Sequence, residues 1–372
     1  MAEKLIIKNW GPIKDIDLNI NKVTVIIGQQ GTGKSIIAKL LYVLSSSEFL
    51  FNKEKERKNI IESYGFFFKK NTFISYQTIN FEVKREKGIF FVKFTGKDRA
   101  FLENIFNTKS TLSGDNFDAF KSWFVFRNQI ENLTGEYKYV PAERIALAST
   151  LRSIRETANR SIYKGNFDQY ILDFANYYDK ASENISSLEI PHLKNVLFKK
   201  ENGNEKVNFN GENLFLYQTS SGFQVSIPLV ILLEYYSKQT EGINKFIIEE
   251  PELNLFPEAQ SKLIKYFIEK INSGNNQMII TTHSPYILTT LNNLIEASKI
   301  GTLRGKTSKV QNILPKKQWL NRKDVSVYQL LANGKSANII AEDGSIKAEN
   351  IDSVSNIINT EYDNLTQIKY GK

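Results

Sequence analysis

The sequence predicts an α/β fold, because three short apolar segments are each followed directly by glycine-rich, acidic or histidine-containing residues of the kinds found in binding and catalytic sites. The segments are residues 23–27, 245–248 and 277–282. Continuous apolar runs of this length are typical of parallel strands that are buried on both faces. Ligands bind such sheets outside the carboxyl ends of the strands. We therefore expect the residues that follow the three segments to form one site.

The first segment leads into a glycine-rich loop with the spacing G-x-x-x-x-G-K-S, and an apolar helical segment follows. Glycines let the backbone curl, so that its N–H groups and the positive end of the helix surround phosphate oxygens. The pattern predicts a nucleotide-binding P-loop, in which Lys34 contacts the β and γ phosphates and Ser35 binds Mg²⁺. The expected nucleotide-binding residues here are Gly28, Gln29, Gln30, Gly31, Thr32, Gly33, Lys34, Ser35 and Ile36.

The second segment ends in two adjacent acids, Glu249 and Glu250. Adjacent residues of a strand point to opposite faces, so the two carboxylates are expected to have different roles. We predict that Glu249 is the Mg²⁺ ligand and that Glu250 is the general base that polarises the attacking water.

Two further elements complete the predicted site. The third segment is followed by His283, one of only two histidines, at a position from which it could reach a γ-phosphate. A Ser/Gly turn at 219–222 opens an apolar helix that continues through Leu233. A helix start with free N–H groups and a hydroxyl is an anion site. We expect Lys34, Glu250 and His283 to be the catalytic residues.

In chain order, the P-loop, Ser/Gly turn, acidic strand and strand-His resemble the ATP-binding-cassette (ABC) class of ATPases. Within that class the chain is similar to the RecF/SMC/Rad50-like and OLD-like AAA-type proteins, many of which serve bacterial phage-defence systems such as Septu, retrons and PARIS. Matching motifs cover about the first 45 residues, 138–144 and 217–290. The resemblance implies an ABC-type head and an ATP-dependent dimer.

The resemblance also assigns roles to individual positions. It implies that Ser221 and Gly222, flanked by Ser220 and Gln224, form the signature loop that binds the γ-phosphate of ATP held by the other subunit. Residues 254–256 fall at the D-loop, and His283 falls at the switch histidine. Departures from the family pattern are Glu249, where transporter cassettes have Asp, and Phe223 in place of a polar signature residue.

Two assignments stay open on the sequence alone. Gln77 and Gln129 are both candidates for the glutamine loop. Trp10 is expected in ordinary core packing, with stacking on adenine as the alternative.

The roughly 180 residues between P-loop and signature loop are too many for a connection and predict an inserted region. Residues 73–94 alternate and are rich in β-branched and aromatic residues, which indicates an antiparallel β lobe. Residues 145–187 have helical spacing and predict a helical arm. We expect four parts: residues 1–50 and 211–300 as the two halves of the ATPase domain, 51–210 as the inserted lobe and arm, and 301–372 as a basic extension.

Net charge is +9, and seven of the basic residues lie between 301 and 323, where there is no acid. A basic cluster in a loop-like segment predicts a contact with DNA or RNA, while a solvated lysine-rich surface is the alternative. We call these residues the C-terminal basic segment: Arg304, Lys306, Lys309, Lys316, Lys317, Arg322 and Lys323.

The composition limits the kinds of binding site that are possible and the expected cellular compartment. The chain has no cysteine, which excludes disulfides and Cys-based zinc sites. No apolar stretch approaches the roughly 20 residues of a membrane span, and residues 1–4 lack a signal-peptide pattern. We expect a cytoplasmic protein without a membrane partner. No Toprim metal-binding pattern follows His283, so any nucleic-acid cleavage is expected from a separate protein.

The sequence therefore predicts a Mg-ATP-dependent ABC-type ATPase that forms a homodimer, or a higher oligomer built on such dimers. Its ATP state would gate DNA binding or a separate nuclease or effector protein, in anti-phage defence. One alternative is a DNA-repair or chromosome-maintenance ATPase of the RecF/Rad50 kind. Another is a scaffold that stores a toxic effector and releases it.

Overall fold

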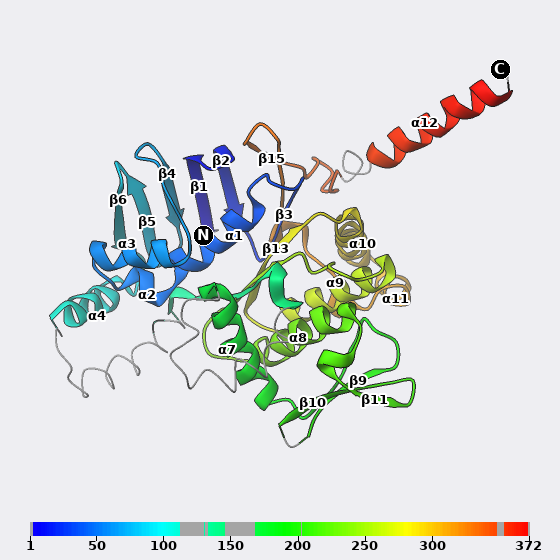
Figure 1. The fold of residues 1–372 in the computed structure, drawn as a ribbon, viewed down its shortest axis with the longest axis horizontal. Helices are drawn as coiled ribbons and strands as arrows, with labels where there is room; N and C mark the ends of the chain where they lie inside the picture. Colours follow the sequence, from blue (N-terminus) through cyan, green and yellow to red (C-terminus); the bar gives the residue numbers. More distant parts are fainter. Residues whose placement is uncertain are drawn as a thin grey trace.

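The structure is a computed structural model, and the residues that it describes form three β-sheets with helices around them (Figure 1). Of the expected helical arm at 145–187, residues 146–167 lie outside the described part of the chain. The described residues are 3–111, 130, 133–145, 168–201, 203–347 and 353–370.

A six-stranded sheet forms the centre of the molecule, in the order β15-β14-β3-β13-β12-β7. Five of these strands pair in parallel, and only β15 is antiparallel to its neighbour β14. The three predicted strands are therefore confirmed, and they are adjacent. In chain order the six strands are β3 (Val23–Gly28), β7 (Tyr137–Val140), β12 (Asn244–Glu249), β13 (Asn276–Thr282), β14 (Val325–Leu330) and β15 (Ser336–Asn338).

Helices pack on this sheet and on one another. Helix α1, which begins at the P-loop lysine, contacts β3, β13, β12 and β7, whereas α9 contacts β13. The signature helix α8 packs against α9 and α7, and α10 packs against α9 and α11. These helices are α1 (Lys34–Ser45), α7 (Gln169–Glu183), α8 (Ser221–Tyr236), α9 (Pro257–Asn272), α10 (Pro285–Gly301) and α11 (Thr307–Gln311).

The second sheet is antiparallel, in the order β2-β1-β4-β5-β6. It confirms the expected β lobe at residues 73–94, and it adds the N-terminal hairpin to that lobe. Helices α3 and α4 contact its edge strand β6. The elements of the lobe are β1 (Glu3–Trp10), β2 (Ile13–Ile20), α2 (Ser47–Leu50), α3 (Glu54–Ser63), β4 (Phe73–Gln77), β5 (Phe81–Glu86), β6 (Ile89–Phe94) and α4 (Arg99–Thr111).

The third sheet is an antiparallel meander in the order β11-β10-β9-β8, and it leads directly into the signature loop through the short helix η3 (Leu216–Gln218). The ring of Phe209 in the meander lies 5.3 Å from the ring of Phe223 in the first turn of α8. The strands are β8 (Ser187–Glu189), β9 (Val196–Glu201), β10 (Asn204–Phe209) and β11 (Glu212–Phe215).

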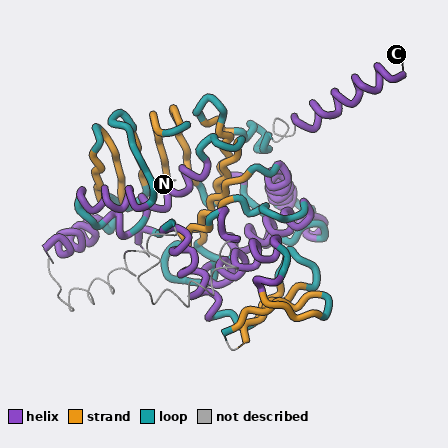
Figure 2. The backbone as a smooth tube through the Cα atoms, viewed as in Figure 1, coloured by secondary structure: helices purple, strands orange, loops and turns teal. Residues whose placement is uncertain are grey.

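The C-terminal region contributes strands to the central sheet. The expectation for residues 301–372 is a basic extension and does not include these strands. Strand β14 pairs with the P-loop strand β3 along its full length. Strand β7 likewise places residues of the expected insertion in the central sheet. The last described helix, α12 (Ser353–Tyr370), projects away from the body of the molecule (Figures 1 and 2). The four-part division of the chain stays a prediction.

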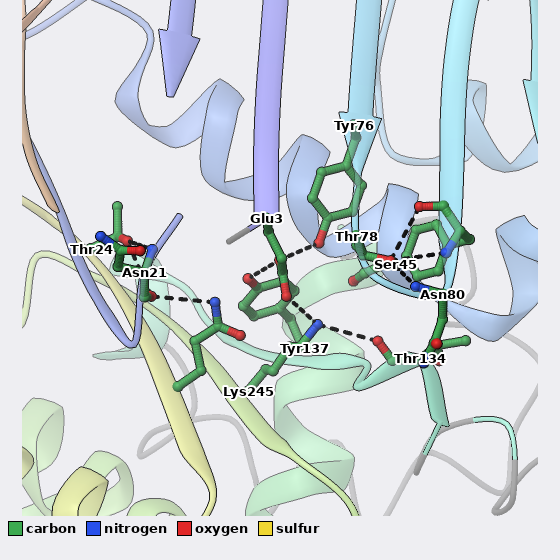
Figure 3. Close-up of polar contacts among 12 residues, drawn as sticks. Glu3, Asn21, Thr24, Ser45, Tyr76, Thr78, Asn80, Thr134, Tyr137 and Lys245 are labelled. Atoms are coloured by element: carbon green, nitrogen blue, oxygen red, sulfur yellow. Dashed lines mark hydrogen bonds and ion pairs between the residues drawn. The ribbon is translucent and has the colours of Figure 1, made fainter. Parts of the chain in front are cut away.

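A buried polar network joins the β lobe to the central sheet (Figure 3). Lys245 at the start of β12 forms an ion pair of 2.5 Å with Glu3 of β1, and it also donates to the Thr134 carbonyl at 3.2 Å. The hydroxyls of Tyr76 and Tyr137 donate to the same Glu3 carboxylate at 2.7 and 2.9 Å. Burial, with the Glu3 charge, raises the pKa of both tyrosines well above the usual value, so both remain donors.

We expect Lys245→Met to destabilise the protein by about 3–5 kcal/mol, because it leaves the Glu3 carboxylate buried without its cation. Denaturant unfolding measures the loss. Lys4→Met in β1, next to Glu3, removes a solvent-exposed pair with Asp17 and should change stability very little. Equal losses for the two variants would contradict a structural role for the buried pair.

Candidate nucleotide-binding site

The P-loop is packed tightly between two other parts of the chain, and this explains its glycines. A Cβ at Gly28 would lie 2.7 Å from the carbonyl oxygen of Leu330 in β14. A Cβ at Gly33 would lie 3.1 Å from the side chain of Ile13, just after the β1–β2 turn. Gly31 and Gly33 also have φ angles of +79° and +101°, which favour glycine. The loop is thus held in shape by β14 and the N-terminal hairpin.

The Lys34 side chain lies within the loop that it serves. Its exposed fraction is 5%, and its Nζ donates to the carbonyls of Gly28 at 2.8 Å and Gln29 at 3.0 Å. The Thr32 hydroxyl donates to the same Gln29 carbonyl at 2.8 Å. Burial lowers the pKa of Lys34, and the nearby carboxylate of Glu250 opposes this shift. The ammonium therefore contacts the loop carbonyls, and its contact with phosphate oxygens stays a prediction.

Glu249 has the environment expected of a metal ligand. Its exposed fraction is 1%, and among the residues that the structure describes neither carboxylate oxygen has a hydrogen-bond partner of standard geometry. Burial raises the pKa of Glu249, and the nearby Tyr139 hydroxyl, the Lys39 charge and the Ser35 hydroxyl offset part of that rise. An unpaired buried carboxylate is costly unless a cation satisfies it. Because Mg²⁺ binds through one or two carboxylates together with substrate phosphates, Glu249 and Ser35 fit this ion.

Glu250 lies beside His283, the expected switch histidine. Its backbone turns to a φ of +42°, and its N–H donates to the Thr281 carbonyl at 2.8 Å. Its carboxylate Oε1 lies 3.3 Å from Nε2 of His283. Glu252, which the sequence did not single out, accepts hydrogen bonds from the Thr282 hydroxyl and the His283 N–H, each at 2.7 Å. Glu252 thus holds the histidine loop at the end of β13.

The signature loop and the D-loop contact each other within the chain. A Cβ at Gly222 would lie 2.7 Å from the Asn254 carbonyl oxygen, so only glycine allows this approach. The Gln224 side chain donates to the carbonyls of Tyr217 at 3.1 Å and Thr219 at 2.7 Å. Gln224 therefore fixes its own loop here, and its contact with a nucleotide stays a prediction, as do those of Ser220 and Ser221.

The open assignments resolve in part. Trp10 is core: it is 5% exposed, its indole N–H donates to the Phe67 carbonyl at 3.1 Å, and it packs against Phe66 and Phe68. Gln77 is exposed at the end of β4, opposite Lys4 of β1. Gln129 lies outside the described residues, so the glutamine loop stays unassigned.

The C-terminal basic segment lies between α10 and β14 in the sequence, far along the chain from the P-loop residues. Six of its seven side chains are exposed, and Arg322 is half-buried. Lys317 forms an ion pair of 2.9 Å with Glu269, and Arg322 donates to the Val325 carbonyl at 3.3 Å. Its contact with DNA or RNA stays a prediction.

Solved structures that are similar to this chain include three SMC head domains. An SMC head bound to the C-winged helix domain of ScpA is 11% identical, with 91% of this chain and 97% of that chain covered and a TM-score of 0.48. The SMC head domain from Thermotoga maritima is 14% identical, with 92% and 100% covered and a TM-score of 0.42. A head with an extended coiled coil, bound to the C-terminal domain of ScpA derived from Pyrococcus furiosus, is 11% identical, with 96% and 99% covered and a TM-score of 0.40.

A search of curated proteins finds no match to this chain. Within the described part of the chain, no helix combines the length and the apolar character that crossing a bilayer requires.

The family model of the AAA ATPase domain matches residues 68–288. The match begins after the P-loop and includes the signature loop, both glutamates of the acidic strand and His283. The match covers more than half of the chain. The P-loop precedes the matched residues in the sequence, and its strand β3 pairs with β13, which lies within the match. This chain therefore belongs to the AAA ATPase domain family.

Proposed function

We propose that the protein is a Mg-ATP-dependent ATPase of the ABC type, in which ATP is held between the P-loop of one subunit and the signature loop of another. The observation that carries the proposal is the 3.3 Å approach of the Glu250 carboxylate to His283, beside the P-loop. The carboxylates of Glu249, Glu250 and Glu252 all act electrostatically on Lys34, which brings the acids and the phosphate-binding lysine into one site.

The residues divide the reaction among them. Lys34 and the loop N–H groups would bind the β and γ phosphates. Mg²⁺, held by Glu249 and Ser35, would neutralise phosphate charge when bound. Glu250 would orient the attacking water and accept its proton, and His283 would hold that carboxylate and contact the γ-phosphate. Glu252 keeps the His283 backbone in place for this contact.

The surface next to the site supports a second subunit. Phe256 in the D-loop is 80% exposed, and Tyr286, three residues after the switch histidine, is 51% exposed. Exposed aromatic side chains are enriched in the centres of protein interfaces. Phe256 lies in the loop that contacts Gly222, just before α9, and Tyr286 lies at the start of α10, close after His283. They are suited to bury against another copy when ATP closes the dimer.

ATP binding would shift the population between open and closed dimers, and this shift would gate DNA binding or a separate nuclease or effector. The C-terminal basic segment supports a nucleic-acid contact, and the resemblance to phage-defence ATPases supports a role in anti-phage defence. A DNA-repair or chromosome-maintenance role uses the same site. A scaffold that stores and releases an effector would bind ATP in the same way but turn it over slowly.

We expect Glu250→Gln to bind ATP and to lower hydrolysis by roughly 10²–10⁴-fold, because the side chain keeps its shape but cannot accept a proton. Lys34→Ala should lose ATP binding, since it removes the phosphate-binding cation. Nucleotide titration and phosphate release measure the two effects. Loss of turnover in Glu249→Gln with an active Glu250→Gln would reverse the two roles. Unchanged affinity in Lys34→Ala would contradict the P-loop assignment.

The composite site predicts complementation between two inactive variants. Lys34→Ala fails at the P-loop, and Ser221→Arg blocks the γ-phosphate approach at the signature loop. A heterodimer of the two has one site with both defects and one site with neither. ATPase activity should recover in part on mixing, and nucleotide-dependent cross-linking of the mixed pair is the second readout. Normal hydrolysis by Ser221→Arg as a strict monomer would rule out the sandwich.

The nucleic-acid contact predicts a change in salt dependence. Replacing four exposed lysines of the C-terminal basic segment with Gln should weaken DNA or RNA binding, and each lost contact to duplex DNA should lower the salt slope by about 0.9. The matched control makes the same charge change in the β lobe region. Equal slopes for the two variants would identify the segment as a solvated surface. The test set is Lys306, Lys309, Lys316 and Lys323, and the control set is Lys58, Lys69, Lys87 and Lys97.

A further inference from the structure

Arg144 is a fully buried cation that joins three elements around the site. It ends the short helix η1 (Ala142–Arg144), which follows β7. Its Nε donates to the Val225 carbonyl of α8 at 3.2 Å. One terminal nitrogen donates to the carbonyls of Pro141 at 3.0 Å and Glu249 at 2.7 Å, and the other donates to the Glu250 carbonyl at 2.8 Å.

The burial of this charge needs a reason beyond packing. A buried cation is costly unless its donors are all used, and an apolar side chain would fill the same space without that cost. Burial lowers the pKa of Arg144 to about 10, so the guanidinium stays charged at neutral pH. Its planar fork can hold several acceptors in a fixed arrangement, which a lysine ammonium cannot do.

The acceptors show what the fork holds. The carbonyls of Glu249 and Glu250 belong to the two peptide groups on either side of the Glu250 Cα. Fixing both peptide planes fixes φ and ψ of Glu250, which has the uncommon φ of +42°. The direction of the Glu250 carboxylate toward His283 therefore depends on Arg144. The same guanidinium also contacts the signature helix, four residues after Ser221.

We propose that Arg144 is a positioning residue that aims the Glu250 carboxylate and couples it to the signature helix of the same chain. Engagement of the signature loop by nucleotide would then set the position of the general base through one rigid side chain. The inference rests on the proposed function, because it takes Glu250 as the general base.

Arg144→Lys keeps the charge and removes the fork. We expect kcat to fall roughly 10–100-fold, because small misplacements of a reacting group have effects of this size. KM and the affinity for ATP, which depend on the P-loop, should stay within about twofold. In a Glu250→Gln background the same substitution should cause no further loss of kcat, since two residues that act through one step are not additive.

Arg57→Lys is a matched control in the β lobe. Arg57 is also buried, its pKa is also lowered by burial to about 10, and it donates to the carbonyls of Phe49, Leu50 and Phe90. Its loss should lower Tm to a similar degree but leave kcat per folded molecule unchanged. Two results would show that Arg144 is structural only: Arg144→Lys lowers Tm but not kcat, as Arg57→Lys does, or Arg144→Lys lowers kcat by the same factor in the wild type and in the Glu250→Gln background. The proposed function would still stand in either case. A wild-type protein that does not hydrolyse ATP would overturn both.

Hydrogen exchange tests the coupling without any Arg144 variant, in case that variant does not fold. ATP should slow exchange in the first turns of α8 and at the Glu250 amide in the wild type. In Ser221→Arg, which still binds ATP but cannot engage its signature loop, both regions should lose the slowing together. A Glu250 amide that is slowed equally in Ser221→Arg would overturn the coupling.

Discussion

The parallel pairing of β12, β13 and β3 is the constraint on which the site depends. Glu249 pairs with Thr281, and Thr281 pairs with Ile26 of the P-loop strand, so the three strands end at one level of the sheet. The two glutamates, His283 and the P-loop meet there only because of this register. A slip of one residue would turn Glu249 to the opposite face, since strand side chains alternate.

Strand β12 carries two buried charges whose surroundings differ. Lys245 at its start has an anion, two tyrosines and a carbonyl around its ion pair, so that end of the strand is fully satisfied. Glu249 at its end has no hydrogen-bond partner of standard geometry in the part of the chain that the structure describes. A satisfied buried network makes a structure rigid, whereas an unsatisfied buried group in a native structure often has a catalytic or ligand-binding role. The strand is anchored at one end, and at the other it carries the buried carboxylate that we propose as a Mg²⁺ ligand.

Local patterns allowed much of this to be predicted from the sequence. The P-loop, the two acids, His283 and the β lobe each lie within a few consecutive residues with a periodicity or spacing of their own. Strand β14 is a short, largely buried segment that contains Val325, Val327 and Leu330, but its place beside β3 depends on a pairing across most of the chain. Arg144 lies in the matching segment 138–144 and Glu252 follows the acidic strand, but the sequence has no signal for the role of either, because a buried charged residue and an exposed one look alike in sequence. Only the carbonyls and N–H groups around them show their roles.

The position of β14 also has a consequence for biosynthesis. β3 and β14 are about 300 residues apart, and ribosomes add about 5–20 residues each second. The ribosome therefore completes β14 roughly 15–60 s after β3, the P-loop strand with which it pairs. During that time one edge of the sheet is unpaired, and unpaired edges are where chains associate wrongly. A nascent chain of this protein should depend on chaperones until its last core strand leaves the ribosome.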